Sequence, residues 1–238
     1  MKILSIGNSF SQDAQRYLHL LAKSEGIDLT CVNIYIGGCS LERHYNNIVS
    51  GEEAYEYELN GVYTGKMISI YQALLLEDWD YVTIQQVSNL SYNIESFFPF
   101  ASALKEFIVK HCKNAKIYVH QTWGYETDSE KISITPFKST EEMFKNVKDT
   151  YAEFASIINA SGIIPSGEAM LSAFKNGLKV YRDGFHASLG LGRYIIALVW
   201  YKFFTKNDIK ISTFCSLDEE ITPYEKEMAI NIVNNIVK

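Results

Sequence analysis

Short apolar runs rich in β-branched residues alternate along this chain with longer segments whose apolar positions recur at helical spacing. This alternation is typical of parallel βαβ units with helices on both faces of the sheet. It predicts strands at Lys2–Ile6, Thr30–Tyr35, Tyr81–Gln85, Lys116–His120 and Ile163–Ile164. It also predicts helices at Asp13–Ser24, Ile68–Leu76, Phe97–His111, Glu141–Ile158, Leu189–Phe204 and Pro223–Val237.

Two segments break the alternation. Residues 54–65 alternate apolar or aromatic with polar positions around Asn60-Gly61, a pair that favours a type I′ turn and so predicts a β-hairpin. Residues 124–142 are polar and longer than an ordinary connection, which indicates a functional or mobile loop. Near the N-terminus, we expect Ser11 to cap the first helix.

The 238 residues, 47% of them hydrophobic, are enough to bury one sizeable core. The predicted fold is one α/β domain over residues 1–238, a three-layer, flavodoxin-like, doubly wound parallel sheet with a small β-hairpin insertion. The expected order of its parallel strands is 2-1-3-4-5.

Charge and hydropathy exclude two classes of partner. The chain has 22 basic and 28 acidic residues, a net charge of −6, and no Lys/Arg-rich run that could follow a phosphate backbone, so no nucleic acid is expected. No uncharged apolar run approaches the about 20 residues of a membrane helix, and the nearest is interrupted by Lys202. The first apolar run stops at Gly7, too early for a signal peptide, so we expect a cytoplasmic protein without a membrane partner.

The four cysteines, Cys31, Cys39, Cys112 and Cys215, show neither C-x-x-C nor metal-ligand spacing. The sequence therefore predicts free thiols, no metal site and no disulfide framework. No cofactor is expected.

Polar residues and glycines follow the first three predicted strands. These segments are Gly7–Ser11, Gly37–Cys39 and Gln85–Asn89. In an open parallel sheet, ligands bind beyond the carboxyl ends of the strands, where the strand order reverses. With the expected order, the three segments become neighbours.

The residues of these segments resemble the motifs of the SGNH (GDSL-like) hydrolases. Gly7-Asn8-Ser9 resembles that family's G-D-S motif, with Asn8 in place of Asp, and Gly38 matches its second motif. The third motif, G-x-N-D, is matched only at Asn89, since Val87 and Leu90 stand at the Gly and Asp positions.

The fourth motif, D-x-x-H near the C-terminal helix, is matched by Asp183 and His186. Segments such as GNSFSQDA, YIGGCSLERH and DGFHAS are similar to an uncharacterised bacterial branch of the family. The resemblance implies an esterase or deacylase with Ser9 as nucleophile. It also implies an oxyanion hole formed by Ser9, Gly38 and Asn89. Gln86 competes with Asn89 for the side-chain donor, because it lies closer to the strand end and its longer side chain could bring an amide N–H to the same point.

The same chemistry follows from the residue types. A serine hydroxyl becomes a good nucleophile when a base removes its proton, and a carboxylate that orients an imidazole makes a better base. The three-residue spacing of Asp183 and His186 can supply such a pair. The tetrahedral intermediate then needs preorganised hydrogen-bond donors.

Trp123 and Tyr125 follow the fourth strand and are expected to line the substrate pocket. The absence of a long apolar loop segment indicates a short acyl group, such as acetyl, and a small-molecule or carbohydrate ester as substrate. The alternative function is a flavodoxin-like module that binds a phosphate or nucleotide at the loop after strand 1. The sequence leaves open the exact acyl group and alcohol, the oligomeric state, and whether a leader preceded Met1.

Overall fold

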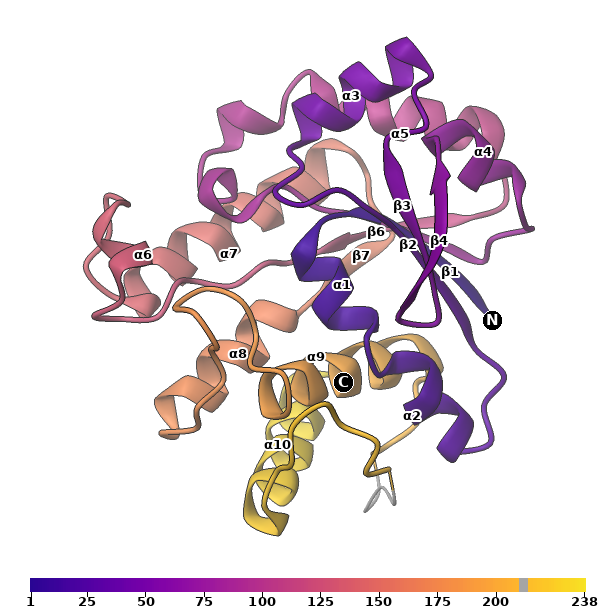
Figure 1. Cartoon of the computed structure of the whole chain (residues 1–238). Helices are drawn as coiled ribbons and strands as arrows, with labels where there is room; N and C mark the ends of the chain where they lie inside the picture. Colours follow the sequence, from indigo (N-terminus) through magenta and orange to yellow (C-terminus); the bar gives the residue numbers. More distant parts are fainter. Residues whose placement is uncertain (210–213) are drawn as a thin grey trace.

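A seven-stranded mixed sheet crosses the computed structural model, which describes residues 1–209 and 214–238 (Figure 1). The strands are β1 (Lys2–Gly7), β2 (Thr30–Tyr35), β3 (Tyr55–Leu59), β4 (Val62–Ile68), β5 (Tyr81–Ile84), β6 (Lys116–His120) and β7 (Gly162–Ile164). Their order in the sheet is β4-β3-β2-β1-β5-β6-β7. The five strands from β2 to β7 in this order pair in parallel, whereas β3 and β4 extend the β2 edge as an antiparallel hairpin.

Helices cover both faces of the sheet. They are α1 (Ser9–Gln15), α2 (Leu18–Ser24), α3 (Leu41–Ser50), α4 (Ile70–Leu75), α5 (Phe100–His111), α6 (Glu130–Ser133), α7 (Thr140–Ile157), α8 (Ser166–Lys175), α9 (Leu191–Thr205) and α10 (Pro223–Ile236). Two 3₁₀ turns, η1 (Ser88–Leu90) and η2 (Ile94–Phe97), follow β5. Among the described residues, no helix has the length and apolar character needed to cross a membrane.

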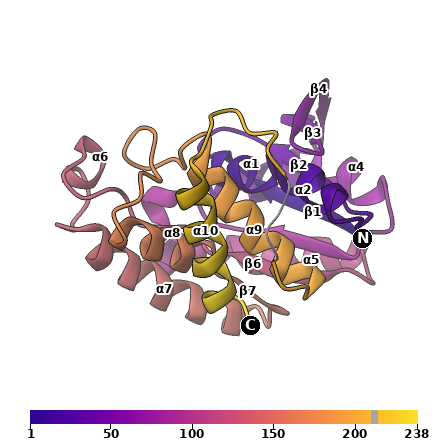
Figure 2. The same ribbon diagram turned by 90° about the horizontal axis from the view of Figure 1, so that it is seen from below.

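The core consists of two layers separated by the sheet. One layer packs α1, α2, α8, α9 and α10 against residues such as Ile3 and Cys31, and Figure 2 shows α8, α9 and α10 together over this face. The other packs α3, α4, α5 and α7 against residues such as Leu4 and Val82. Successive strand residues point to opposite faces, so strands that are apolar throughout are buried on both sides. The predicted three-layer α/β fold is confirmed, and the parallel strands have the expected order.

The hairpin forms where the sequence predicts it. Asn60 and Gly61 have φ values of 53° and 80°, and Leu59 pairs with Val62 across this two-residue turn. Strand β4, the second strand of the hairpin, continues to Ile68, so the prediction that a helix begins at Ile68 is wrong. The Ser69 hydroxyl accepts a hydrogen bond from Gln72 N–H, and α4 therefore begins at Ile70.

The beginning of the first helix was predicted incorrectly. Its cap is Asn8, whose side chain accepts a hydrogen bond from Phe10 N–H. Ser11 lies inside the first turn and accepts from Asn8 N–H, which completes a capping box. The helix therefore follows β1 directly and places Ser9 in its first turn.

Other boundaries also differ from the predictions. The helix predicted at residues 13–24 is divided into α1 and α2, and the helix predicted from Phe97 begins at Phe100. Helices α3 and α8 were not predicted. The α3 segment is strongly amphipathic and buries Leu41, His44 and Asn47 along one side, so its helical periodicity could have been recognised. The α8 helix buries mostly small residues, such as Gly167 and Ala169.

Candidate active site

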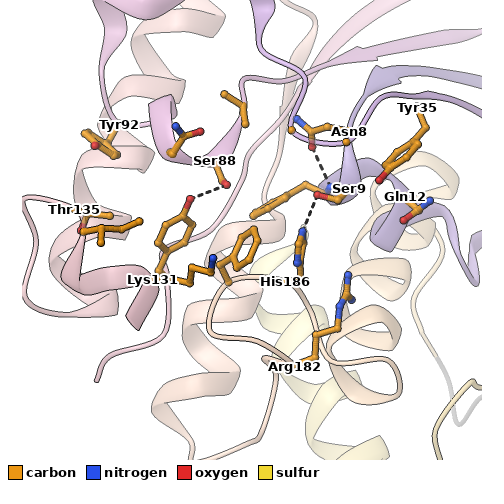
Figure 3. A pocket seen from close by; sticks show the side chains of 18 residues that line it. Asn8, Ser9, Gln12, Tyr35, Ser88, Tyr92, Lys131, Thr135, Arg182 and His186 are labelled. Carbon is orange, nitrogen blue, oxygen red and sulfur yellow. Dashed lines mark hydrogen bonds between the residues drawn. The ribbon is translucent and has the colours of Figure 1, made fainter. Parts of the chain in front are cut away.

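Three loops after parallel strands meet at one cavity of about 570 Å³ (Figure 3). Ser9 follows β1, Gly37 and Gly38 follow β2, and Asn89 follows β5. His186 comes from the segment before α9 and faces Ser9. The structure thus brings the residues predicted at strand ends together with the distant D-x-x-H segment.

Ser9, His186 and Asp183 form a chain of hydrogen bonds. Ser9 Oγ lies 2.8 Å from His186 Nε2, and His186 Nδ1 lies 2.7 Å from Asp183 Oδ2. The other carboxylate oxygen of Asp183 accepts a hydrogen bond from His186 N–H at 2.8 Å. With a proton on Nδ1, the imidazole donates to Asp183 and leaves Nε2 to accept from the serine hydroxyl.

The charge state of Asp183 suits this arrangement. Partial burial acts to raise the pKa of its carboxyl, but the hydrogen bonds from the side chain and backbone of His186 outweigh it and lower the pKa below its ordinary value. The carboxylate can therefore orient the imidazole and stabilise an imidazolium when His186 takes up a proton.

The turn that carries His186 is clamped on both sides. Arg182 N–H donates to His186 O at 3.1 Å, and Glu126 N–H donates to Gly184 O at 2.7 Å. Gly184 has a φ of 85°, and a Cβ there would lie 2.7 Å from Ser129 Cβ. The loop at residues 124–142 therefore packs directly against the turn, and only glycine fits at this contact.

The two predicted pocket aromatics have different positions. Tyr125 lines the cavity, and its hydroxyl lies 2.9 Å from Ser88 Oγ. Trp123 does not line it, so this prediction is wrong: its side chain is fully buried, stacks on Phe10 at 4.1 Å and donates to Phe185 O at 2.7 Å. Trp123 supports the cavity wall from behind, because burying its large ring in the core is favourable while its N–H finds an acceptor.

Asn8 connects the three strand ends beneath Ser9. Its Oδ1 accepts from Gln85 Nε2 at 2.7 Å, and its Nδ2 donates to Cys39 O at 3.1 Å. Gln85 Oε1 in turn lies 2.5 Å from His120 Nδ1. Burial lowers the pKa of His120 to about 3, so this imidazole is neutral and completes the network without charge. Asn8 stands where the G-D-S motif of the SGNH hydrolases has Asp, and its amide both accepts and donates in this network.

The candidate oxyanion donors are also distinguished by the structure. Gly38, with a φ of 61°, and Asn89 are exposed and line the cavity with Ser9. Gln86 is fully buried and does not line it. Its Oε1 accepts from Leu41 N–H and Val87 N–H, and its Nε2 donates to Ser96 O.

Several cavity residues were not predicted from the sequence. They are Gln12, Tyr35, Tyr92, Lys131, Ile134, Thr135, Arg182 and Phe185. Arg182 and Phe185 could have been suspected, because they flank or lie within the D-x-x-H segment. Within the described ranges, no group of three or more His, Cys, Asp or Glu side chains is placed to hold a metal ion.

A family model described as "Domain of unknown function (DUF4886)" matches residues 2–233. The crystal structure of a DUF4886 family protein from Bacteroides uniformis is 34% identical, with a TM-score of 0.91, and the match covers 100% of this chain and 94% of that chain. No curated protein matches this chain.

More distant structures share the fold. A protein from Slackia heliotrinireducens described as a candidate SGNH hydrolase is 22% identical, with a TM-score of 0.60 over 85% of this chain and 97% of that chain. The esterase EstA from Pseudoalteromonas is 16% identical, with a TM-score of 0.55, and the match covers 86% of this chain and 97% of that chain. The chain therefore has an SGNH hydrolase-like fold, as its motifs implied, and this fold points to a hydrolase.

Proposed function

Since this chain belongs to the DUF4886 family and its fold resembles that of the SGNH hydrolases, we propose that it is a serine esterase with a Ser9–His186–Asp183 triad. The observation that carries the proposal is the continuous hydrogen-bonded chain from Ser9 Oγ through the imidazole to the carboxylate. Fold alone would not assign an activity, but this geometry matches the requirements of an activated serine nucleophile.

The reaction would proceed in two steps. Ser9 Oγ attacks the ester carbonyl while His186 Nε2 takes its proton, and the imidazolium then protonates the departing alcohol. Water, deprotonated by the same imidazole, attacks the acyl-serine and releases the acid and the free serine. In both steps Ser9 N–H, Gly38 N–H and the Asn89 amide would donate to the oxyanion.

A short acyl group, in particular acetyl, is part of the proposal. The cavity of about 570 Å³ combines apolar side chains such as Ile134 and Phe185 with tyrosines, polar residues and two cations. Such a mixed lining suits a polar alcohol, for example a sugar, better than a long hydrocarbon chain. A cytoplasmic location remains part of this proposal as well.

The alternative phosphate- or nucleotide-binding module is less well supported. In such a module, free N–H groups at the first turn of a helix would bind the phosphate. Here the N–H of Phe10 is already occupied by Asn8 Oδ1, and the hydrogen bonds among Ser9, His186 and Asp183 would have no role.

A covalent probe tests the nucleophile. The Pseudoalteromonas esterase has been described in a form inhibited by monoethylphosphonate, and we expect a fluorophosphonate to label Ser9 of this protein in the same chemical manner. Ser9→Ala should abolish labelling, whereas Ser88→Ala, which removes another hydroxyl from the same cavity, should retain it. Mass spectrometry locates the adduct. Undiminished labelling of Ser9→Ala would place the nucleophile elsewhere.

The acyl preference can be measured with p-nitrophenyl esters of increasing chain length. We expect the highest kcat/KM for acetate and a decline of at least about tenfold by decanoate, because polar side chains and two cations interrupt the apolar part of the lining. Faster cleavage of the decanoyl ester would contradict the short-chain assignment and indicate a lipase.

A further inference from the structure

The charge of the cavity lining differs in sign from that of the whole chain. The protein has a net charge of −6, yet among the described residues that line the cavity there are two cations, Lys131 and Arg182, and no carboxylate. Figure 3 shows them on different sides of Ser9, with Lys131 toward Thr135 and Arg182 toward Gln12. A cavity of this kind attracts anions and disfavours cations.

Arg182 is held in place from below. Its Nη1 donates to both carboxylate oxygens of Asp13, at 2.9 and 3.1 Å, and to Ala187 O at 2.5 Å. Asp13 is fully buried, whereas the Arg182 side chain is 25% exposed. The three contacts use Nη1, so Nε and Nη2 retain N–H donors with no acceptor among residues 1–209 and 214–238. A guanidinium anchored on one nitrogen with unused donors on the others is preorganised to bind an oxyanion.

The surrounding ion pairs do not neutralise this site. Asp13 is shared between Arg182 and Arg193, and Asp218 between Arg193 and Arg16, which leaves three guanidinium groups against two carboxylates. Asp183, the neighbour of Arg182 in the chain, is engaged by His186, and the Glu58 oxygens accept from Gln12 Nε2 and Asn33 Nδ2. Burial raises the pKa of Glu58 above its ordinary value, and hydrogen bonds from Asn33 and Gln12 oppose this effect.

A second donor lies on the same side of the cavity. Tyr35 lines it, and its hydroxyl oxygen lies so close to Gly37 that a Cβ there would be 3.1 Å away. Burial raises the pKa of Tyr35, and nearby carboxylates add to this effect while Arg182 opposes it, so the phenol stays protonated and can donate. Gln12, on the first helix, completes this side of the lining.

We propose that Arg182, together with the Tyr35 hydroxyl, binds a carboxylate or similar oxyanion on the alcohol part of the substrate, so that the enzyme acts on esters of acidic alcohols such as acylated sugar acids. This inference rests on the proposed esterase function, since an acetyl group is uncharged and the anion must then belong to the alcohol. Charge-assisted hydrogen bonds to a guanidinium are directional as well as strong, so they would select the substrate and fix its register on Ser9.

Two measurements on the full chain test the inference. Calorimetric titration of the Ser9→Ala protein with glucuronate and with glucose compares ligands that differ only at C6, where a carboxylate replaces the hydroxymethyl group, and it requires no turnover. Steady-state kinetics of the unmodified protein on a 3-O-acetyl methyl glucuronide and its glucoside gives the selectivity in kcat/KM. We expect the acidic ligand to be favoured at least about tenfold in both.

Three variants separate the roles of the cations. Arg182→Gln should remove the preference for the acidic ligand. It should weaken the binding of glucuronate at least about tenfold and change the binding of glucose less than about threefold. Arg182→Lys keeps a cation for Asp13 but lacks the unused donors, so it should lose most of the preference while preserving the fold. Lys131→Gln removes one positive charge from the other side of the cavity, and this variant should retain most of the preference for the acidic ligand.

Equal binding of glucuronate and glucose, or no glucuronate binding at millimolar concentration, would overturn the inference. It would also be overturned if Arg182→Gln weakened both ligands equally, which would mean that Arg182 only braces the turn through Ala187, or if Lys131→Gln had the larger effect. A protein that binds glucuronate selectively but resists the phosphonate probe would instead contradict the proposed esterase function alone.

Discussion

Asp183 is 43% exposed, and the His186 side chain that it contacts is 18% exposed, so the proposed triad is partly open to solvent. The carboxylate accepts two hydrogen bonds from one residue, one from the ring and one from the backbone. Because the backbone contact fixes the carboxylate, replacing Asp183 should affect the imidazole tautomer more than the shape of the turn.

We therefore expect Asp183→Asn to leave the fold unchanged and to lower kcat by up to about four orders of magnitude, as in other triads. Hydrolysis of p-nitrophenyl acetate, with circular dichroism to check folding, measures this. Asp149→Asn, at an exposed ion pair on α7, is the control and should have no effect. A loss below about tenfold would show that another group orients His186.

Asn89 and Gln86 can be ranked by where their amides lie. Asn89→Ala should lower kcat at least about a hundredfold with KM nearly unchanged, because an oxyanion donor acts mainly in the transition state. Gln86→Ala should have a milder effect on kcat but should lower the free energy of unfolding by about 1–3 kcal/mol, since the buried N–H of Leu41 and the partly buried N–H of Val87 lose their acceptor. Measurements of kcat and KM at a temperature where both variants are fully folded decide between the two residues. A larger loss of kcat in Gln86→Ala would transfer the role of oxyanion donor to Gln86.

The roles of single residues could be predicted only where spacing restricts the geometry. Asp183 and His186 are three residues apart, so their contact is local. Trp123 was placed in the pocket wall because it follows a strand, but the side chain turns into the core, where its contact with Phe10 outweighs exposure at the cavity. Such a choice between two faces depends on residues far away in the sequence.

The hairpin of β3 and β4 was predicted from alternation and the Asn60-Gly61 pair, but its packing was not. The turn lies against the end of α1, where a Cβ on Gly61 would be 2.6 Å from Arg16 O. Gly65, in β4, also has a φ of 80°, yet a Cβ there would meet nothing within 4 Å among the described residues. Substitutions at these two glycines therefore distinguish the cost of backbone strain, present at both positions, from the cost of a clash at the end of α1, present only at Gly61.

Gly65→Ala should lower the free energy of unfolding by about 1–2 kcal/mol, the cost of a left-handed conformation for alanine. Gly61→Ala should lower it by about 3 kcal/mol or more, since the methyl group also meets backbone atoms that cannot move freely. Urea denaturation of both variants measures the difference. Equal losses would show that the contact with α1 contributes nothing.

Helix boundaries differed from the predictions where a side chain, not hydrophobic periodicity, determines them. Asn8 begins α1 and Ser69 begins α4, each by accepting a hydrogen bond from a backbone N–H. For the first helix the sequence predicts Ser11 as the cap, whereas the structure selects Asn8, which directly follows β1. The Ser40 hydroxyl likewise caps α3 after the Gly37-Gly38 turn.

The whole molecule is organised by the sheet, whose order places the ends of β1, β2 and β5 side by side. The parallel order was predictable because sequential βαβ units have few alternatives. The attachment of the hairpin to the β2 edge was not, since nothing in residues 54–65 specifies which edge it joins. That the chain is one domain remains a prediction, as does its location in the cell.

The sequence by itself determined the α/β alternation, the strand-end motifs and the spacing of Asp183 and His186, because these depend on residues close together in the chain. Only the tertiary structure decided that Ser9 meets His186, 177 positions away, and that Arg182 rests on Asp13, 169 positions away. It also buried Gln86 and left Asn89 at the cavity. Packing determines which polar groups keep free donors, and no local pattern records it.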